Sequence, residues 1–175
     1  MKQVKKSWMA VVMGALLLGT LVGVVWARPH ERPQSQDITR KVNLTGGEFI
    51  PGDEAQSWYN NGNVIQCDSG ICFFIAPVVF PCLPSVTVER FILYAEDNHA
   101  SANATASLHR VYMPTKKDVF LGQVLTPSGT AGYQPWSSGA INKTVWPSQR
   151  AYIYLWIGGP NIEVYGVTVE YHRNI

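Results

Sequence analysis

The sequence predicts an all-β domain, an antiparallel β-sandwich of jelly-roll type, preceded by an N-terminal hydrophobic export segment. Short runs rich in Val, Ile, Tyr, Phe and Trp are broken by clusters of Gly, Pro, Asn, Asp and Ser, as in strands joined by turns. After the N-terminal segment, no window shows the apolar stripe of an amphipathic helix. Strand-like runs without intervening helices favour antiparallel pairing in two packed sheets.

The N-terminus begins with three lysines, followed by an uncharged apolar run over residues 8–27. This pattern predicts that residues 1–27 are a signal peptide cleaved after Ala27, or a single-span membrane anchor with the lysines inside. Residues 28–37 are polar and contain prolines, which is typical of a tether. Both alternatives place the domain, residues 38–175, outside the cytoplasm, secreted or membrane-anchored, and limit membrane contact to the N-terminal segment.

The charge pattern argues against nucleic acid as a partner. Without the three N-terminal lysines, 11 basic residues face 12 acidic ones, so the exported part is close to neutral. It has no basic stripe with interleaved aromatic residues, which a nucleic-acid-binding protein would need.

The cysteines predict a disulfide, because export leads to an oxidising compartment. Cys67 and Cys72 flank the turn-rich tetrapeptide DSGI between two apolar runs, so we expect them to face each other across a hairpin. This pairing leaves Cys82 unpaired. A bridge between Cys72 and Cys82 is the alternative.

The predicted strands follow one another from residue 38 to residue 171, each an apolar or alternating run bounded by turn residues. They cover residues 38–44, 57–59, 64–67, 72–76, 86–96, 104–113, 119–125, 141–145, 152–157 and 162–171. The run 152–157 is apolar on both faces, which favours a central strand covered on both sides. The turn GGPN predicts a hairpin between this strand and the last one. In the last strand the apolar alternation slips by one residue, which predicts a β-bulge at Gly166.

The stretch YAEDNHASANATASLHRVY places Glu96, Asp97, Asn98 and His99 side by side. Asp and Asn are favoured in turns, so we interpret this cluster as a polar loop between two strands. Calcium is the one cofactor that the sequence suggests, but Glu96, Asp97 and Asn98 would supply only part of the six to eight oxygen ligands that it takes. No second zinc ligand stands near His99, and His109 is expected on the polar face of a strand.

Aromatic residues in turn-rich segments are the best candidates for ligand contact. Trp58 and Tyr59 lie in QSWYNNGN, and Tyr133 and Trp136 lie in GTAGYQPWSSG. Large rings at the end of a sandwich form a platform for a sugar ring or a protein partner. The structural alternative is that these rings close the core.

Three stretches, LYAEDNHASANATASLHRVY, AYIYLWI and IEVYGVTVEY, make residues 38–175 similar to exported bacterial proteins with a single β-sandwich domain. The resemblance implies fold and compartment, and it carries over no catalytic residue. The sequence therefore predicts a non-enzymatic binding or structural module at the cell surface, with a glycan or protein ligand. The alternatives are a small glycan hydrolase that uses Asp97 or Glu96 with His99 nearby, and a protein that self-assembles into oligomers through an apolar face.

Overall fold

The computed structural model describes residues 38–52, 57–81 and 85–174. The expected export segment, the tether and Cys82 lie outside the described residues. Within the described part of the chain, no helix has the length and apolar character needed to span a membrane.

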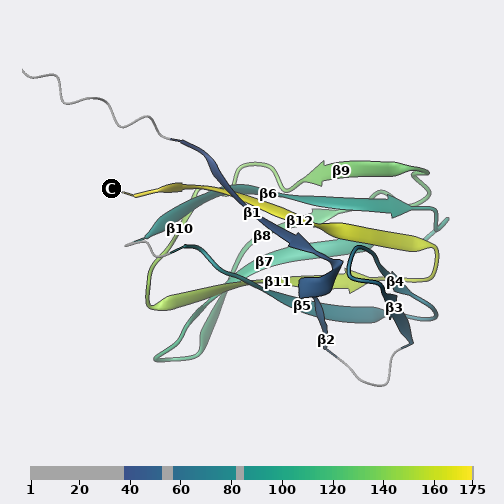
Figure 1. Cartoon of the computed structure of the whole chain (residues 1–175), viewed down its shortest axis with the longest axis horizontal. Coiled ribbons are helices and arrows are strands. Elements are labelled where there is room, and N and C mark those ends of the chain that lie inside the picture. Colours follow the sequence, from purple (N-terminus) through teal and green to yellow (C-terminus); the bar gives the residue numbers. More distant parts are fainter. Residues whose placement is uncertain (1–37, 53–56, 82–84, 175) are drawn as a thin grey trace, which may run out of the picture. The chain divides into compact units, whose positions relative to one another are not determined.

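The domain is an antiparallel β-sandwich of two sheets, as predicted (Figure 1). Sheet A has seven strands: β1 (Arg40–Thr45), β3 (Trp58–Asn60), β4 (Ile65–Cys67), β6 (Val86–Asp97), β9 (Tyr133–Ser137), β10 (Lys143–Val145) and β12 (Ile162–Arg173). Sheet B has five strands: β2 (Ile50–Pro51), β5 (Cys72–Val78), β7 (Ala104–Tyr112), β8 (Lys117–Leu125) and β11 (Gln149–Ile157). A short 3-10 helix, η1 (Gly46–Glu48), follows β1.

The two longest strands, β6 and β12, pair with each other at the centre of sheet A. The other edge of β12 pairs with β1 and with β4, and β4 pairs with β3. The other edge of β6 pairs with β9 and with β10. In sheet B the order is β2, β5, β11, β7, β8. Strands β3 and β9 therefore lie on opposite sides of the central pair.

The core lies between the sheets and is built by the period-2 alternation of the strands. In β6, Phe91, Leu93 and Ala95 are fully buried, and in β11, Ile153 and Leu155 face them from sheet B. The residues between them in each strand are only half-buried. Each sheet thus presents an outer face whose side chains are available to other molecules.

All ten predicted strands are present, but the structure adds two strands and corrects several expectations about how the strands are arranged. β2 and β9 were not predicted, because β2 has two residues and β9 (YQPWS) contains a proline and has no buried alternation. The predicted hairpin between residues 152–157 and 162–171 is wrong. These strands are β11 in sheet B and β12 in sheet A, so the turn between them crosses from one sheet to the other. β11 is central, but only its inner face is buried.

The predicted bulge at Gly166 is confirmed. The register of β12 against β6 shifts between Val164, which pairs with Ala95, and Gly166, which pairs with Tyr94. Tyr165 is the inserted residue. Gly166 has φ of 151°, and a Cβ there would clash with the carbonyl oxygen of Leu44 on β1. Only glycine fits this position, because the backbone angle and the close approach of β1 both exclude a side chain.

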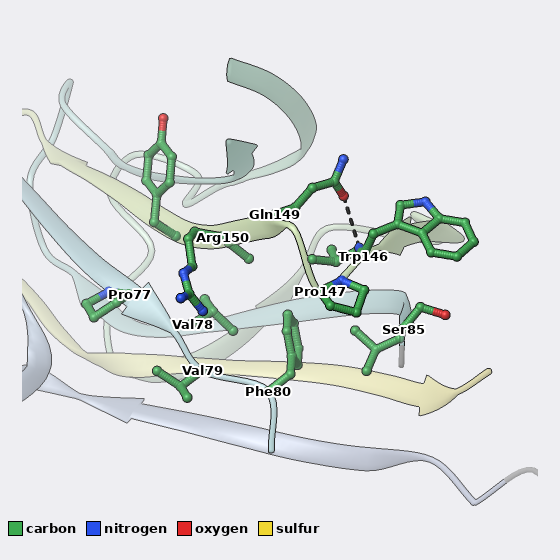
Figure 2. Close-up of a pocket in the computed structure, with 13 residues that line it drawn as sticks. Pro77, Val78, Val79, Phe80, Ser85, Trp146, Pro147, Gln149 and Arg150 are labelled. Carbon is green, nitrogen blue, oxygen red and sulfur yellow. Dashed lines mark hydrogen bonds between the residues drawn. The ribbon is translucent and has the colours of Figure 1, made fainter. Parts of the chain in front are cut away.

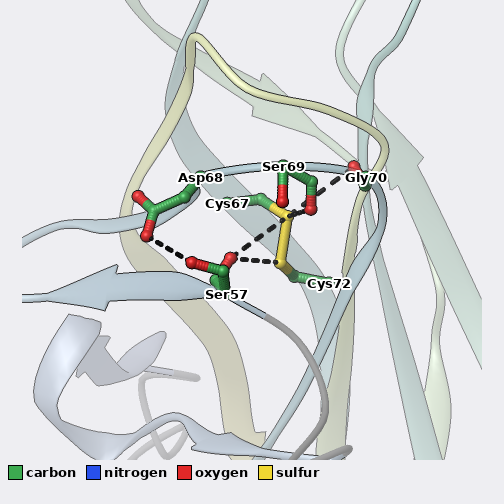
Figure 3. The surroundings of a disulfide bond; sticks show 6 residues. All are labelled: Ser57, Cys67, Asp68, Ser69, Gly70 and Cys72. Carbon is green, nitrogen blue, oxygen red and sulfur yellow. Dashed lines mark hydrogen bonds between the residues drawn. A yellow bond between two sulfur atoms is a disulfide. The ribbon is translucent and has the colours of Figure 1, made fainter.

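The predicted disulfide between Cys67 and Cys72 is present, with a Cα–Cα distance of 5.7 Å. The hairpin expected around it is wrong, because Cys67 ends β4 in sheet A and Cys72 begins β5 in sheet B. The bridge therefore joins the two sheets. Figure 3 shows Ser57 beside it: the Ser57 hydroxyl donates to the Asp68 carboxylate (2.9 Å), and the Asp68 N–H donates to the Ser57 carbonyl (3.0 Å).

Replacing both bridged cysteines by serine should lower the free energy of unfolding by about 2 kcal/mol, because the bridge closes a short loop in the unfolded chain. Urea unfolding followed by circular dichroism measures the loss. Reductant should reproduce it in the parent and change nothing in the Cys67→Ser/Cys72→Ser variant. Equal stability of the oxidised and reduced parent would contradict the prediction.

Gly166→Ala should lower the free energy of unfolding by about 2 kcal/mol or more, because the added Cβ meets the β1 backbone in a conformation that side chains rarely adopt. The matched control is Gly129→Ala. Gly129 also has a positive φ, of 71°, but a Cβ there would have no heavy atom within 4 Å. The control should cost about 1 kcal/mol. Equal losses in the two variants would show that contact with β1 does not matter.

Candidate functional site

Two of the predicted aromatic residues close the core. Trp58 is half-buried, and its ring meets Phe74 edge-on with a centroid distance of 5.8 Å. Trp136 is also half-buried and packs against the core cluster. These two side chains match the structural alternative for the aromatic residues, in which the rings close the core.

The other two are exposed and lie far apart in the sheet. Tyr59, on β3, is 50% exposed, and Tyr133, on β9, is 55% exposed. Strands β4, β12 and β6 separate β3 from β9. The four predicted residues therefore do not gather at one edge of the sandwich, and a ligand-binding role stays a prediction for Tyr59 and Tyr133.

The strand register places these two tyrosines at the ends of one continuous row across the outer face of sheet A. Neighbouring members are direct cross-strand partners, and the row reads Tyr133, Glu96, Glu163, Gln66, Tyr59. We call these five residues the glutamate row. Four strand spacings of about 4.8 Å give it a length of about 19 Å.

Two glutamates stand side by side in the middle of the row. Like charges directly opposite each other on a sheet are destabilising, so this pair has a cost in the isolated domain. In the described part of the chain, neither Glu96 nor Glu163 forms an ion pair. Glu163 accepts a hydrogen bond from the Tyr165 hydroxyl (2.8 Å), and Glu96 accepts one from the Asn98 side-chain amide (2.8 Å). Carboxylate oxygens have room for more than one donor each.

Three tyrosines form a cluster at one end of the row, around its member Tyr133. Tyr94 and Tyr133 are stacked at 6.1 Å, and Tyr165 meets Tyr133 edge-on at 5.1 Å. A shallow hollow of about 180 Å³ adjoins the three rings, and its polar lining includes Asn43 and Thr45 from β1. The aromatic rings and the hydrogen-bonding groups are therefore adjacent on one open face.

The hydrogen bond to Glu163 raises the pKa of Tyr165 to about 12, with burial and the negative charges of Glu163 and Glu96 acting in the same direction. Burial, and then the neighbouring Tyr94, raise the pKa of Tyr133 as well. Both phenols therefore stay protonated at neutral pH: the Tyr165 proton is donated to Glu163, and the Tyr133 hydroxyl can donate a hydrogen bond to a ligand.

The loop interpreted from the sequence begins only at Asn98 and His99, because β6 continues through Glu96 and Asp97, and Asp97 holds this loop. The Asp97 carboxylate is fully buried and accepts hydrogen bonds from the Thr126 hydroxyl and from the backbone N–H of His99. His99 in turn accepts from the N–H groups of Ser101 and Ala102 through Nδ1. These bonds give Asp97 and His99 a structural role.

The three candidate calcium ligands do not converge. Glu96 and Asp97 are neighbours on a strand, so Glu96 points to the outer face and Asp97 points into the sandwich. Asn98 donates to Glu96 and does not reach Asp97. Over residues 38–52, 57–81 and 85–174, no three His, Cys, Asp or Glu side chains are grouped so as to hold a metal ion.

A larger hollow lies elsewhere, between the end of β5 and the start of β11, and measures about 590 Å³ (Figure 2). Its lining is mostly apolar, with Val78, Phe80 and Pro147 among its members. Figure 2 shows Arg150 extending from β11 toward β5, and Gln149 accepting a hydrogen bond from the Trp146 N–H (3.0 Å). The hollow brings no pair of carboxylates together.

Sequence reasoning missed four residues of the outer face of sheet A: Gln66, Tyr94, Glu163 and Tyr165. The alternation in IEVYGVTVEY does place Glu163 and Tyr165 on the polar side of the last strand. No sequence signal shows that β12 lies between β6 and β4, and this strand order forms the row.

The raised pKa of Tyr165 predicts a loss of stability at high pH. The folded value of about 12 lies above the ordinary value of 10.0, so between these pH values the unfolded chain ionises while the folded one does not. The stabilisation is complete below about pH 10 and is lost as the pH rises toward 12. Urea unfolding between pH 9 and about pH 12 should therefore show a steeper decline for the parent than for Tyr165→Phe.

Glu163→Gln is the matched variant, because it removes the charge and keeps the shape. It should move the titration of Tyr165 toward its ordinary pH, as measured by phenolate absorbance. Tyr152, on sheet B, also has its pKa raised to about 12, so the comparison is made in a Tyr152→Phe background. A Tyr165 titration that Glu163→Gln leaves unchanged would contradict the assignment.

No protein-family model and no curated protein matches the chain. Its fold is similar to solved structures of carbohydrate-binding modules. The C-terminal CBM6 of LamC, a laminarinase from Zobellia galactanivorans, has a TM-score of 0.47 and 11% identity, with 74% of this chain and 98% of that chain covered. The xylan-binding module CBM15 has a TM-score of 0.46 and 11% identity, with 79% and 99% covered. The module CBM36, in complex with calcium and xylotriose, has a TM-score of 0.45 and 11% identity, with 75% and 98% covered.

Proposed function

We propose that the protein is a non-catalytic glycan-binding module whose ligand lies along the glutamate row. The observation that carries this proposal is the row itself, with an exposed tyrosine at each end and two carboxylates and an amide between them. At about 19 Å, the row is long enough for an oligosaccharide chain.

The chemistry of the row suits a sugar chain. Sugar rings have apolar faces that stack on exposed aromatic rings, which Tyr59 and Tyr133 offer. Their hydroxyl groups donate hydrogen bonds, and carboxylate acceptors form stronger bonds than neutral ones. Hydroxyls bound to Glu96 and Glu163 would also reduce the repulsion between the two charges.

An exported location supports the same function. The bridge between Cys67 and Cys72 is the kind of bond that persists in oxidising compartments. The lysines and apolar run of residues 1–27 predict export, and surface and extracellular glycans would be within reach of a domain outside the cytoplasm.

A glycan hydrolase is the second candidate, and one observation favours it. Glu96 and Glu163 are two carboxylates directly opposite each other, and glycosidases use such a pair on either side of the bond they cleave. The pair lies on an open sheet face. Asp97, which the sequence offered as one of the acids, is buried and already hydrogen-bonded.

The proposal is tested with the purified chain and a panel of soluble polysaccharides, using affinity electrophoresis and calorimetry. Tyr59→Ala and Tyr133→Ala should each weaken binding about tenfold, which corresponds to about 1.4 kcal/mol. Glu163→Gln should also weaken it, because a neutral acceptor replaces a charged one. The matched control is Trp146→Ala, which removes a 55% exposed aromatic ring outside the row and should leave affinity unchanged.

Two outcomes would count against the proposal. If Tyr59→Ala and Tyr133→Ala bind as tightly as the parent, the ligand does not lie along the row. If the parent releases reducing ends from a bound polysaccharide and Glu163→Gln does not, the protein is a hydrolase.

A further inference from the structure

The outer face of sheet B is chemically unlike that of sheet A. Its side chains lie in cross-strand rows, and two of the rows contain no charged residue. One reads Ile50, Ile75, Tyr154, Ser107, Gln123, and the other reads Phe73, Trp156, Thr105, Leu125. Ile50 is 64% exposed and Ile75 is 39% exposed. A solvent-facing apolar patch of this kind marks an interaction surface.

A third row on this face combines a projecting ring with a hollow. It reads Pro77, Tyr152, His109, Phe120, in the strand order β5, β11, β7, β8. Phe120, at one end, is 55% exposed. At the other end, Ile50, Ile75, Pro77 and Tyr152 line an almost wholly apolar hollow of about 400 Å³. Phe120 on β8 and the hollow at β5 lie on opposite sides of the midline between β11 and β7, each about one and a half strand spacings from it.

Among the described residues of β5, β11, β7 and β8, the outward-facing rows carry one cation, Arg150, and one anion, Asp118. Asp118 accepts a hydrogen bond from the Tyr152 hydroxyl (3.0 Å), and its carboxylate lies 3.1 Å from Nδ1 of His109. Arg150 shares a row with Asp118, with Val111 between them. A face with one cation and one anion complements neither a polyanion nor a polycation, but it does complement a copy of itself.

We propose that a second copy of this chain packs against the outer face of sheet B, with Phe120 of each copy inserted into the hollow of the other. The two-fold axis runs parallel to the strands, in the plane of contact and midway between β11 and β7. It places β8 of one copy over β5 of its partner. The partner's Phe120 then lies over Pro77. A two-fold interface needs such a reciprocal arrangement, in which each copy supplies both the projecting ring and the hollow that receives it.

The size of the face fits a weak, specific dimer. When each strand is counted at its full width of about 4.8 Å, β5, β11, β7 and β8 cover about 20 Å, and the four rows, at about 6.6 Å each, cover about 25 Å along the strands. The footprint is on the order of 500 Å² per copy and about 1,000 Å² in total, which is near the lower limit for a specific interface. The dimer should therefore dissociate in the micromolar range.

Back-to-back packing leaves both copies of sheet A facing outward. With sheets about 10 Å apart, four stacked sheets separate the two outer sheets by about 30 Å. If sheet A binds glycans as proposed, the dimer would join two glycan chains on its opposite sides. This consequence alone rests on the proposed function.

Sedimentation velocity of the full chain, from about 1 to about 200 µM, tests the dimer without any glycan. The parent should shift from the monomer mass to twice that mass. Phe120→Lys and Ile75→Lys should each weaken dimerisation at least 100-fold, because each places a charge in an apolar contact. The matched control is Ile38→Lys, at a 62% exposed isoleucine just before β1, and it should dimerise as the parent does.

An equimolar mixture of Phe120→Lys and Ile75→Glu distinguishes this arrangement from non-specific association. The first variant keeps the hollow and the second keeps the projecting ring, so the mixed dimer retains one of the two contacts, pairs Lys with Glu in the other, and should form more readily than either variant alone. Circular dichroism confirms that each variant is folded.

A parent that stays monomeric up to about 200 µM overturns the proposal. So does a dimer that survives both lysine substitutions, or a mixture that stays as monomeric as its components. A monomeric parent that adsorbs to insoluble polysaccharide and loses adsorption with Ile75→Lys would assign this face to a flat glycan surface instead. Glycan binding by the monomeric variants is measured separately, so failure of the dimer does not affect the test of the glutamate row.

Discussion

The pairing of β6 with β12 is the interaction on which the rest of sheet A depends. These strands are the two longest, and every other strand of the sheet pairs directly or through β4 with one of them. The bulge at Gly166 inserts one residue into β12, which keeps the apolar side chains on the inner face before and after it. Tyr165, the inserted residue, lies on the outer face next to Tyr133. The bulge therefore lies directly beside the candidate site.

The two ends of the outer face of sheet A differ in how their charges are satisfied. Near the C-terminal end of β12, Glu170 binds Arg90 (2.6 Å) and Lys41 (3.0 Å). The hydrogen bond from Arg90 is the main cause of the lowered pKa of Glu170, and Lys41 adds to it. At the other end, Glu96 and Glu163 face each other, and no cation among the described residues pairs with either of them. Glu170 is thus held in ion pairs, whereas Glu96 and Glu163 can accept further hydrogen bonds. These two lie between the exposed tyrosines.

The two outer faces divide the surface chemistry of the sandwich. Sheet A presents carboxylates, amides and tyrosine hydroxyls, which suit a ligand rich in hydroxyl groups. Sheet B presents aliphatic and aromatic side chains with few charges, which suit an apolar contact with a second copy of the same face. Because the faces point in opposite directions, occupation of one leaves the other accessible.

The sequence by itself determined the features that depend on residues close together in the chain. Strand-forming runs, the bulge at Gly166 and the turn that begins at Asn98 follow from period-2 alternation and turn residues, which are local signals. The short spacing of Cys67 and Cys72 favoured their disulfide, but the sequence left a bridge between Cys72 and Cys82 open. β9 was not predicted, because its exposed, proline-containing sequence lacks that alternation.

Only the tertiary structure decided which strands are neighbours. Strands pair through backbone hydrogen bonds that any residue but proline can form, so the sequence of a strand carries little information about its partner. For this reason the sequence did not show that the turn after residue 157 crosses from one sheet to the other. Tyr59 and Tyr133 were identifiable as exposed aromatic residues, but their connection through Gln66, Glu163 and Glu96 exists only because β4, β12 and β6 lie between them.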